Sequence, residues 1–274
     1  MNVLGSVFNR NENFYWQNGH TNPSYSPMNY QPAQPETGTD DQTKAIATAG
    51  GLQIIAMLLQ KVSQWCSNKL MAGKEFASAE DVKKVADHMV DKHKLNVAVD
   101  YIDESKVGKY PTNMRGMIET VAKGQNAFYL DEAKLAVAPK SKPSLILHEL
   151  GHAANAVKGK FMRLLQKSRG YVAAVPAALV YINNLFKKDD GQPTFIEKHA
   201  GKIGFAAFLP TIIEEGLASY RGVNAAKNVL GKAANLKPLK RNYFTAWLTY
   251  LISGLGLGVA AKQCVLQNKG AQQQ

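Results

Sequence analysis

The residues SLILHELGHAANAV, 144–157, have the pattern of one helix with a face toward the core. Pro143 stands just before it and suits the first turn of a helix. His148 and His152 are four residues apart, so their imidazoles lie one turn apart on the same helical face. An apolar stripe roughly opposite them is expected to face the core. The stripe consists of Ile146, Leu150, Ala153 and Val157.

The same helix carries the pattern H-E-x-x-H, which is typical of a metal site. Two imidazoles at this spacing can bind one cation with ring nitrogens about 2.0–2.1 Å away. Glu149 is rotated by about 100° from His148, so its carboxylate lies where it can take a proton from a metal-bound water. The pattern therefore predicts Zn²⁺ as cofactor and Glu149 as general base. Without a metal, three polar side chains in an apolar helix would need other partners.

A catalytic zinc takes three protein ligands and keeps one open position, so a third ligand must come from elsewhere. The longer pattern H-E-x-x-H-x-x-G-x-x-H is not present, which excludes the metzincin arrangement. Glu214 and Glu215 directly follow an apolar run, where a carboxylate is costly unless it is paired, metal-bound or solvated. The alternative is a pair of acids in the first turn of a helix, favoured by the helix dipole. The other histidines are His20 in the N-terminal segment, His88 and His93 at solvated helix positions, and His199.

HELGH followed by Glu215-x-x-Ala218 resembles the gluzincins. The layout is most similar to the membrane metalloproteases that include the heat-shock protease and the prenyl-protein endopeptidase. The resemblance covers residues 126–225. It implies a zinc-dependent endopeptidase that hydrolyses a peptide or protein substrate, with Glu215 as the third ligand beside His148 and His152. That family has an Asp directly after the Ala, whereas this chain has Ser219, so an expected partner of a metal ligand is missing.

The resemblance also implies two features around the metal. Such enzymes hold an extended substrate against an edge strand of the sheet, and residues 126–130 or 134–138 are the candidates. They also place a His, Tyr or Arg near the third ligand to stabilise the charge that develops in the transition state. The candidates for that role are Tyr220, Arg221 and His199.

The order of the predicted elements gives an α+β fold, a mainly helical zincin-like domain with a small sheet before the HExxH helix. Helices are expected from Lys44, from Ser78 to about Lys92, and from Pro143 to about Gln267. Short β-type runs between Leu95 and Pro139 predict a mainly antiparallel sheet, with LDEAK as a hairpin connection. The predicted organisation is a disordered tail over 1–43, a metallopeptidase domain over 44–267 and a C-terminal tail over 268–274.

The composition narrows the class of protein. With 274 residues, 45% hydrophobic and 20% charged, the chain is not wholly disordered, collagen-like or a coiled coil. The formal charge of +12 favours an acidic partner such as an anionic membrane surface. Two cysteines exclude a disulfide framework and favour a reducing compartment, and the N-terminus lacks the pattern of a signal peptide.

Charge-poor stretches predict membrane association. Of the four such stretches, 45–59, 171–186, 203–213 and 243–261, only the last has the roughly 20 residues that a spanning helix needs. Basic residues in 158–169 and 221–241 place the active site on the cytoplasmic side by the positive-inside rule. The alternatives are a cytoplasmic enzyme with buried core helices and a non-catalytic membrane-associated metal-binding protein. Nucleic acid is not expected as a partner, because the basic residues flank apolar helices.

Overall fold

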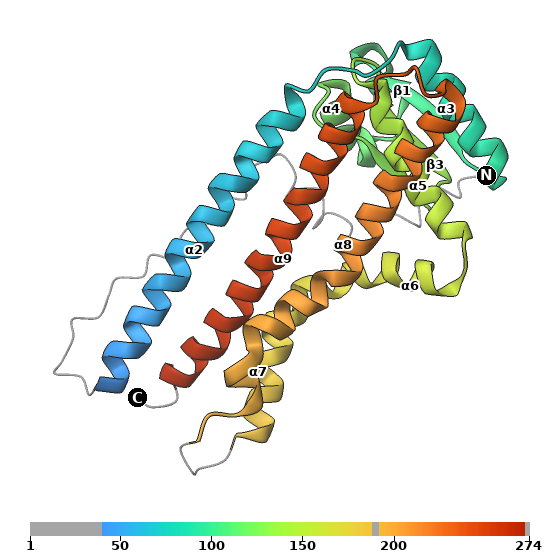
Figure 1. The fold of residues 1–274 in the computed structure, drawn as a ribbon. Helices are drawn as coiled ribbons and strands as arrows, with labels where there is room; N and C mark the ends of the chain where they lie inside the picture. The colour runs from blue at the N-terminus through green and yellow to red at the C-terminus, as the bar shows by residue number, and fades with distance from the viewer. Residues whose placement is uncertain (1–39, 188–191, 272–274) are drawn as a thin grey trace. The chain divides into compact units, whose positions relative to one another are not determined.

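The computed structural model describes residues 40–187 and 192–271, and this part of the chain is mainly helical with one small sheet (Figure 1). The predicted α+β plan is confirmed at this level. The elements are α2 (Asp40–Met71), α3 (Ala79–His93), β1 (Ala98–Ile102), α4 (Arg115–Ala122), β2 (Phe128–Leu130), β3 (Leu135–Pro139), α5 (Ile146–Val157), α6 (Lys160–Ser168), α7 (Val175–Phe186), α8 (Phe195–Leu230) and α9 (Lys237–Ala271). Short 3₁₀ turns connect several of them, among them Pro143–Leu145 directly before α5.

The chain forms two compact units, and its longest helices contribute to both. The described part of the first unit is 66–167 and 213–248, which includes the sheet, α3, α4, α5 and α6. The second unit contains the described residues of 40–65, 168–212 and 249–271, which are mainly helical and include no strand.

The sheet has three strands in the order β1-β3-β2. Strand β2 pairs antiparallel with β3, which confirms the predicted hairpin over residues 130–134. The prediction of a mainly antiparallel sheet is wrong for the other pair, because β1 runs parallel to β3. The connection from β1 passes through α4, and such a crossover allows parallel pairing. Strand β3 is central, so residues 134–138 are not an edge, whereas β2 is one of the two edges.

Side chains alternate along β3 between two cores. Ala136 and Ala138 face a cluster that includes Leu150 of α5 and residues of α3 and α8. Val137 faces the opposite side, where it packs with Ile118 of α4. This period of two places helices on both faces of the sheet and explains why the strand has no polar residue. The sheet is thus the platform on which α5 lies.

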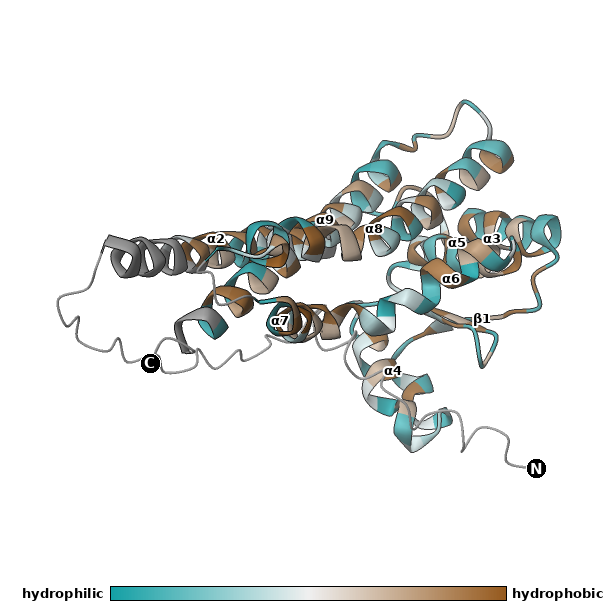
Figure 2. Ribbon diagram, turned by 90° about the horizontal axis from the view of Figure 1, so that it is seen from below, coloured by the Kyte–Doolittle hydropathy of each residue, from teal (hydrophilic) through white to brown (hydrophobic). Residues whose placement is uncertain are grey.

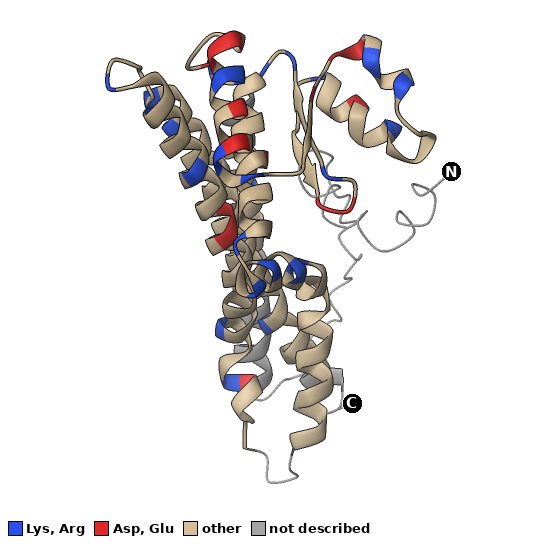
Figure 3. Ribbon diagram, turned by 90° about the vertical axis from the view of Figure 1, so that its right-hand side faces the viewer, with Lys and Arg blue, Asp and Glu red and all other residues tan. Residues whose placement is uncertain are grey.

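The second unit is apolar inside and, over much of its surface, outside. Its core joins α7 with residues 195–212 of α8 and 249–271 of α9 through Leu179, Ala200, Ala261 and Val265. Hydrophobic residues dominate α7 and α9 in Figure 2, and α7 carries no Lys, Arg, Asp or Glu (Figure 3). The sequence has no charged residue over 244–261 of α9 either. Large apolar side chains are nevertheless exposed on this unit, including Tyr171, Tyr181, Leu185, Phe186 and Phe195.

One helix among the described residues is long and apolar enough to cross a membrane, Lys237–Asn268, with a mean hydropathy of 1.5 over its most apolar window. Only 22% of that window is buried inside the structure. The prediction that 243–261 alone has spanning length is therefore confirmed. Residues 171–186 do not form one long helix, because the 3₁₀ turn Arg169–Ala174 precedes the 12 residues of α7.

At both ends the helices extend beyond the predicted boundaries of the domain, residues 44 and 267. Helix α2 begins at Asp40 rather than Lys44, and the rest of the predicted tail over 1–43 lies outside the described residues. Helix α9 continues to Ala271, into the predicted C-terminal tail, whose last residues 272–274 are also outside the described part.

Candidate metal centre

Four side chains position the 3₁₀ turn Pro143–Leu145, which leads directly into the HExxH helix α5. Pro143 opens the preceding 3₁₀ turn, as its sequence position predicts. The backbone N–H and the hydroxyl of Ser144 donate to the carboxylate of Glu75, at 3.2 and 3.0 Å. The hydroxyl of Tyr243 donates to the Ser144 carbonyl at 2.7 Å. These bonds satisfy backbone groups at the buried start of the helix and set its position.

Helix α5 is buried along most of its length. Ile146, Leu150 and Ala153 pack in the core as the apolar stripe predicts. Val157 departs from that prediction and is 54% exposed, because it is the last residue of the helix. Burial on several sides of one helix requires close packing against α8.

Two small residues allow that close packing. A Cβ on Gly151 would lie 2.3 Å from the carbonyl oxygen of Ala218, and a Cβ on Gly222 would lie 2.9 Å from the carbonyl oxygen of Leu147. Each contact is therefore backbone against backbone, which only glycine permits at this separation. The pairing of 151 with 218 and of 147 with 222 means that the two helices run antiparallel. This crossing brings residues 215 and 219 of α8 opposite the histidines of α5.

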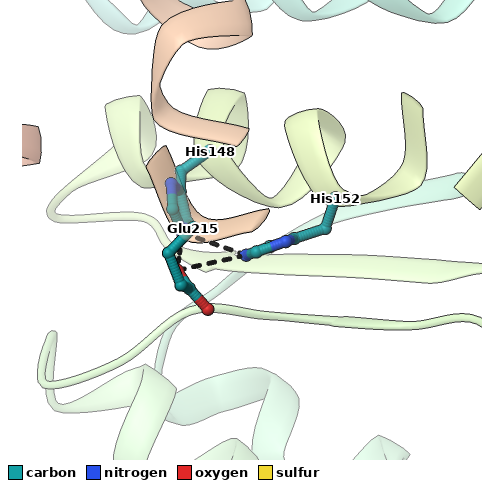
Figure 4. Close-up of side chains that lie close together, drawn as sticks. All are labelled: His148, His152 and Glu215. Atoms are coloured by element: carbon teal, nitrogen blue, oxygen red, sulfur yellow. Dashed lines mark hydrogen bonds and ion pairs between the residues drawn. The ribbon is translucent and has the colours of Figure 1, made fainter. Parts of the chain in front are cut away.

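Three candidate metal ligands converge at this crossing. His148 and His152 extend from α5 and Glu215 from α8, and their side chains point toward one another (Figure 4). Glu215 Oε2 lies 3.0 Å from His148 Nε2 and 3.6 Å from His152 Nε2, and the two Nε2 atoms are 3.0 Å apart. Glu215 is 1% exposed and His152 7% exposed, so the donors meet in a nearly closed site.

The chemistry of these donors fits a small divalent cation. Four ligands at about 2.05 Å from a tetrahedral zinc are about 3.3 Å from one another, and the three observed separations lie around that value. Two imidazole nitrogens and one carboxylate form a ligand set that zinc prefers in catalytic sites. With both opposite ring nitrogens hydrogen-bonded, the atoms that face one another are mainly acceptors, which favours a cation between them.

The outer partners of the histidines orient both rings. Ser219 Oγ lies 3.0 Å from His148 Nδ1, so this serine is the hydrogen-bond partner of that ring nitrogen. The carboxylate of Glu214 accepts from His152 Nδ1 at 2.8 Å. A bond of this kind fixes the ring tautomer that leaves Nε2 free to bind a metal. The sequence predicts only that Glu214 is paired, metal-bound or solvated, and the structure shows it paired with His152.

Glu214 is itself held by amide side chains. Asn155 Nδ2 and Gln166 Nε2 each donate to its Oε1 at 3.0 Å. Gln166 also donates to the His152 carbonyl at 2.9 Å, and Arg221 Nε donates to Asn155 Oδ1 at 2.6 Å. His152, Asn155 and Gln166 therefore all donate to one oxygen of this buried carboxylate. No spacing rule in the sequence indicates this network, since Gln166 belongs to a separate helix, α6.

The remaining predicted residues are placed as follows. Glu149 is buried on α5, 7% exposed and next to His148 in the chain. Glu214 and Glu215 lie in the middle of α8, so the alternative of a helix N-terminus is wrong; Pro210 does not interrupt this 36-residue helix. Tyr220 is 66% exposed. His199 belongs to the second unit, where its ring centroid lies 4.6 Å from that of Phe195.

We found no matching family model, no matching curated protein and no matching solved structure for this chain. The geometry of the centre and the sequence pattern therefore carry the functional argument.

Proposed function

We propose that the chain is a zinc-dependent metalloendopeptidase of the gluzincin type, similar in layout to the membrane heat-shock protease and prenyl-protein endopeptidase. One observation carries the proposal: donor atoms of His148, His152 and Glu215 all lie within 4.8 Å of one another, with Glu149 on the same helix as the histidines. The H-E-x-x-H pattern gives a reason why these residues would hold zinc rather than form an ordinary buried cluster.

The proposed mechanism assigns a task to each side chain. When bound, zinc supplies Lewis acidity and lowers the pKa of a coordinated water. Glu149 accepts a proton from the attacking water on its carboxylate and passes it to the nitrogen of the leaving amine. Glu214 and Ser219 hold the histidine rings in the orientation that this chemistry requires. Arg221 donates to Asn155, which in turn donates to Glu214, so Arg221 supports the partner of His152.

The proposal also covers how a peptide substrate binds and where in the cell the protein lies. Strand β2 is an edge of the sheet and packs against α5, so it is the strand on which an extended peptide would add. The apolar helix Lys237–Asn268 and the exposed apolar side chains of the second unit support membrane association. The basic residues of 158–169 and 221–241 favour a site on the cytoplasmic side.

The test separates zinc binding from hydrolysis with Glu149→Gln. Zinc content, measured on the dialysed protein, is expected to remain at the wild-type level, because Glu149 is not a ligand. Hydrolysis of a quenched fluorescent peptide library is expected to fall by about 10²–10⁴-fold, the contribution typical of a general base. Glu132→Gln is the matched control, since it removes an exposed carboxylate from the β2–β3 turn.

Retained proteolysis in Glu149→Gln would refute the assigned base. If the wild-type chain binds zinc but hydrolyses no member of the library, the result would instead support a non-catalytic membrane-associated metal-binding protein.

A further inference from the structure

A second site lies in the first unit, outside the metal ligands. It is a pocket of about 230 Å³ between α3, the end of α5 and α8. Its lining includes Lys92 and His93 from α3, Lys158 after α5, and Tyr220 and Arg221 from α8. A cavity needs about 10–15 Å³ to hold one water, so this pocket has room for a group of several heavy atoms.

The lining is cationic and has no acidic member. Lys92, Lys158 and Arg221 carry three positive charges around one small volume. Among the described residues no carboxylate lies within 4.0 Å of any of these three groups, whereas other lysines of the same unit, such as Lys106 and Lys134, form ion pairs. Like charges held together without a counter-charge are unfavourable, so the arrangement favours an anion between them.

The imidazole of His93 is affected by the same positive charges. Its pKa is lowered by burial and then by the positive charges of Arg221, Lys158 and Lys92. At neutral pH a neutral imidazole can still donate one hydrogen bond to an oxyanion.

Arg221 is oriented for binding before any ligand arrives. Its Nε donates to Asn155 Oδ1 at 2.6 Å, which fixes the plane of the guanidinium group. Within the described part of the chain its two terminal nitrogens make no hydrogen bond. A guanidinium fixed on one side presents a fork of donors on the other, which matches two oxygens of a phosphate.

We propose that this pocket binds a phosphate monoester, held by Arg221, Lys92 and Lys158. The charge decides between oxyanions: three permanent positive charges complement a phosphate of about −1.5 to −2 better than a single carboxylate. The phosphate can belong to a lipid headgroup at an anionic membrane surface or to a soluble phosphate compound. The pocket shares no side chain with the three metal ligands, so the proposal does not depend on the zinc assignment.

The experiment measures binding of inorganic phosphate to the purified full chain in neutral detergent by isothermal titration calorimetry, at constant ionic strength set with chloride. Saturable binding is expected for the wild type. Lys92→Gln/Lys158→Gln is expected to weaken it at least about tenfold, because two of the three cations are removed. The control Lys109→Gln/Lys123→Gln changes the net charge equally at exposed positions outside the pocket and should change the affinity by less than about twofold.

A second titration distinguishes the sources. If dihexanoyl phosphatidic acid binds at least tenfold more tightly than inorganic phosphate, and loses this advantage in Lys92→Gln/Lys158→Gln, the ligand is a lipid headgroup. Equal affinity for the two assigns a soluble phosphate compound. Absence of saturable phosphate binding, or equal weakening by both double variants, would overturn the proposal. Phosphate that binds at the metal centre instead would keep its affinity in Lys92→Gln/Lys158→Gln. That result would also overturn the proposed pocket, and it would leave the zinc assignment untouched.

Discussion

Gly151→Ala tests whether the close crossing of α5 and α8 builds the metal centre. The added Cβ would lie 2.3 Å from the Ala218 carbonyl oxygen and 2.7 Å from its Cα. Real contacts of this kind essentially never fall below 3.0 Å, so the helices must separate by about 0.7 Å, and no rotamer change can relieve a backbone contact. Metal–ligand distances tolerate only about 0.2 Å, so Glu215 would leave its place relative to His148.

The expected result has two parts. Overpacking costs about 1–3 kcal/mol, and the better helix propensity of alanine offsets about 1 kcal/mol of that cost. The free energy of unfolding of the metal-free chain should therefore fall by up to about 2 kcal/mol. Zinc affinity, measured by competition with a chelator, should fall at least about tenfold because the displaced ligand no longer closes the site.

Gly116→Ala is the matched control. Nothing lies within 4 Å of a Cβ at that position on α4, so thermal stability should be unchanged or slightly higher and zinc affinity unchanged. A Gly151→Ala variant with wild-type zinc affinity and unfolding temperature would refute the argument from the helix crossing.

Three further changes test the surroundings of the site. Glu214→Gln should weaken zinc binding by about 10–100-fold, because the oriented His152 loses its carboxylate partner; unchanged chelator competition would contradict this. Ser219→Ala should weaken it less, since a neutral hydroxyl is the weaker partner, and a larger loss than in Glu214→Gln would reverse that ranking. Burial raises the pKa of Glu75 above its ordinary 4.5, against the two bonds from Ser144, so protonation of Glu75 stabilises the folded state. The unfolding temperature of the wild type relative to Glu75→Gln should therefore fall as pH rises from 4.5 through the raised pKa, and a pH-independent difference would show that reasoning to be wrong.

The local parts of the fold could be predicted from the sequence because they depend on neighbours in the chain. Ser78 caps α3 through Asp81, and Pro143 opens the turn before α5, as their positions indicate. The spacing of His148 and His152 predicts that their side chains share one face of a helix, and their Nε2 atoms do lie together.

The long-range parts could not be predicted because they depend on packing between distant residues. The parallel pairing of β1 with β3 has no local signal. The position of Glu215 rests on the contact of Gly151 with Ala218, 67 residues later, and nothing in H-E-x-x-H indicates which helix will lie there. The partnership of Glu214 with His152 depends on that same crossing.

The most direct test of the central claim is the zinc content of the dialysed full chain, compared between the wild type, Glu215→Gln and the control Glu132→Gln. Three ligands that share one cation predict about one zinc per chain in the wild type and the control, and a large loss in Glu215→Gln. A wild-type chain without zinc, or a Glu215→Gln chain that keeps it in full, would contradict the account.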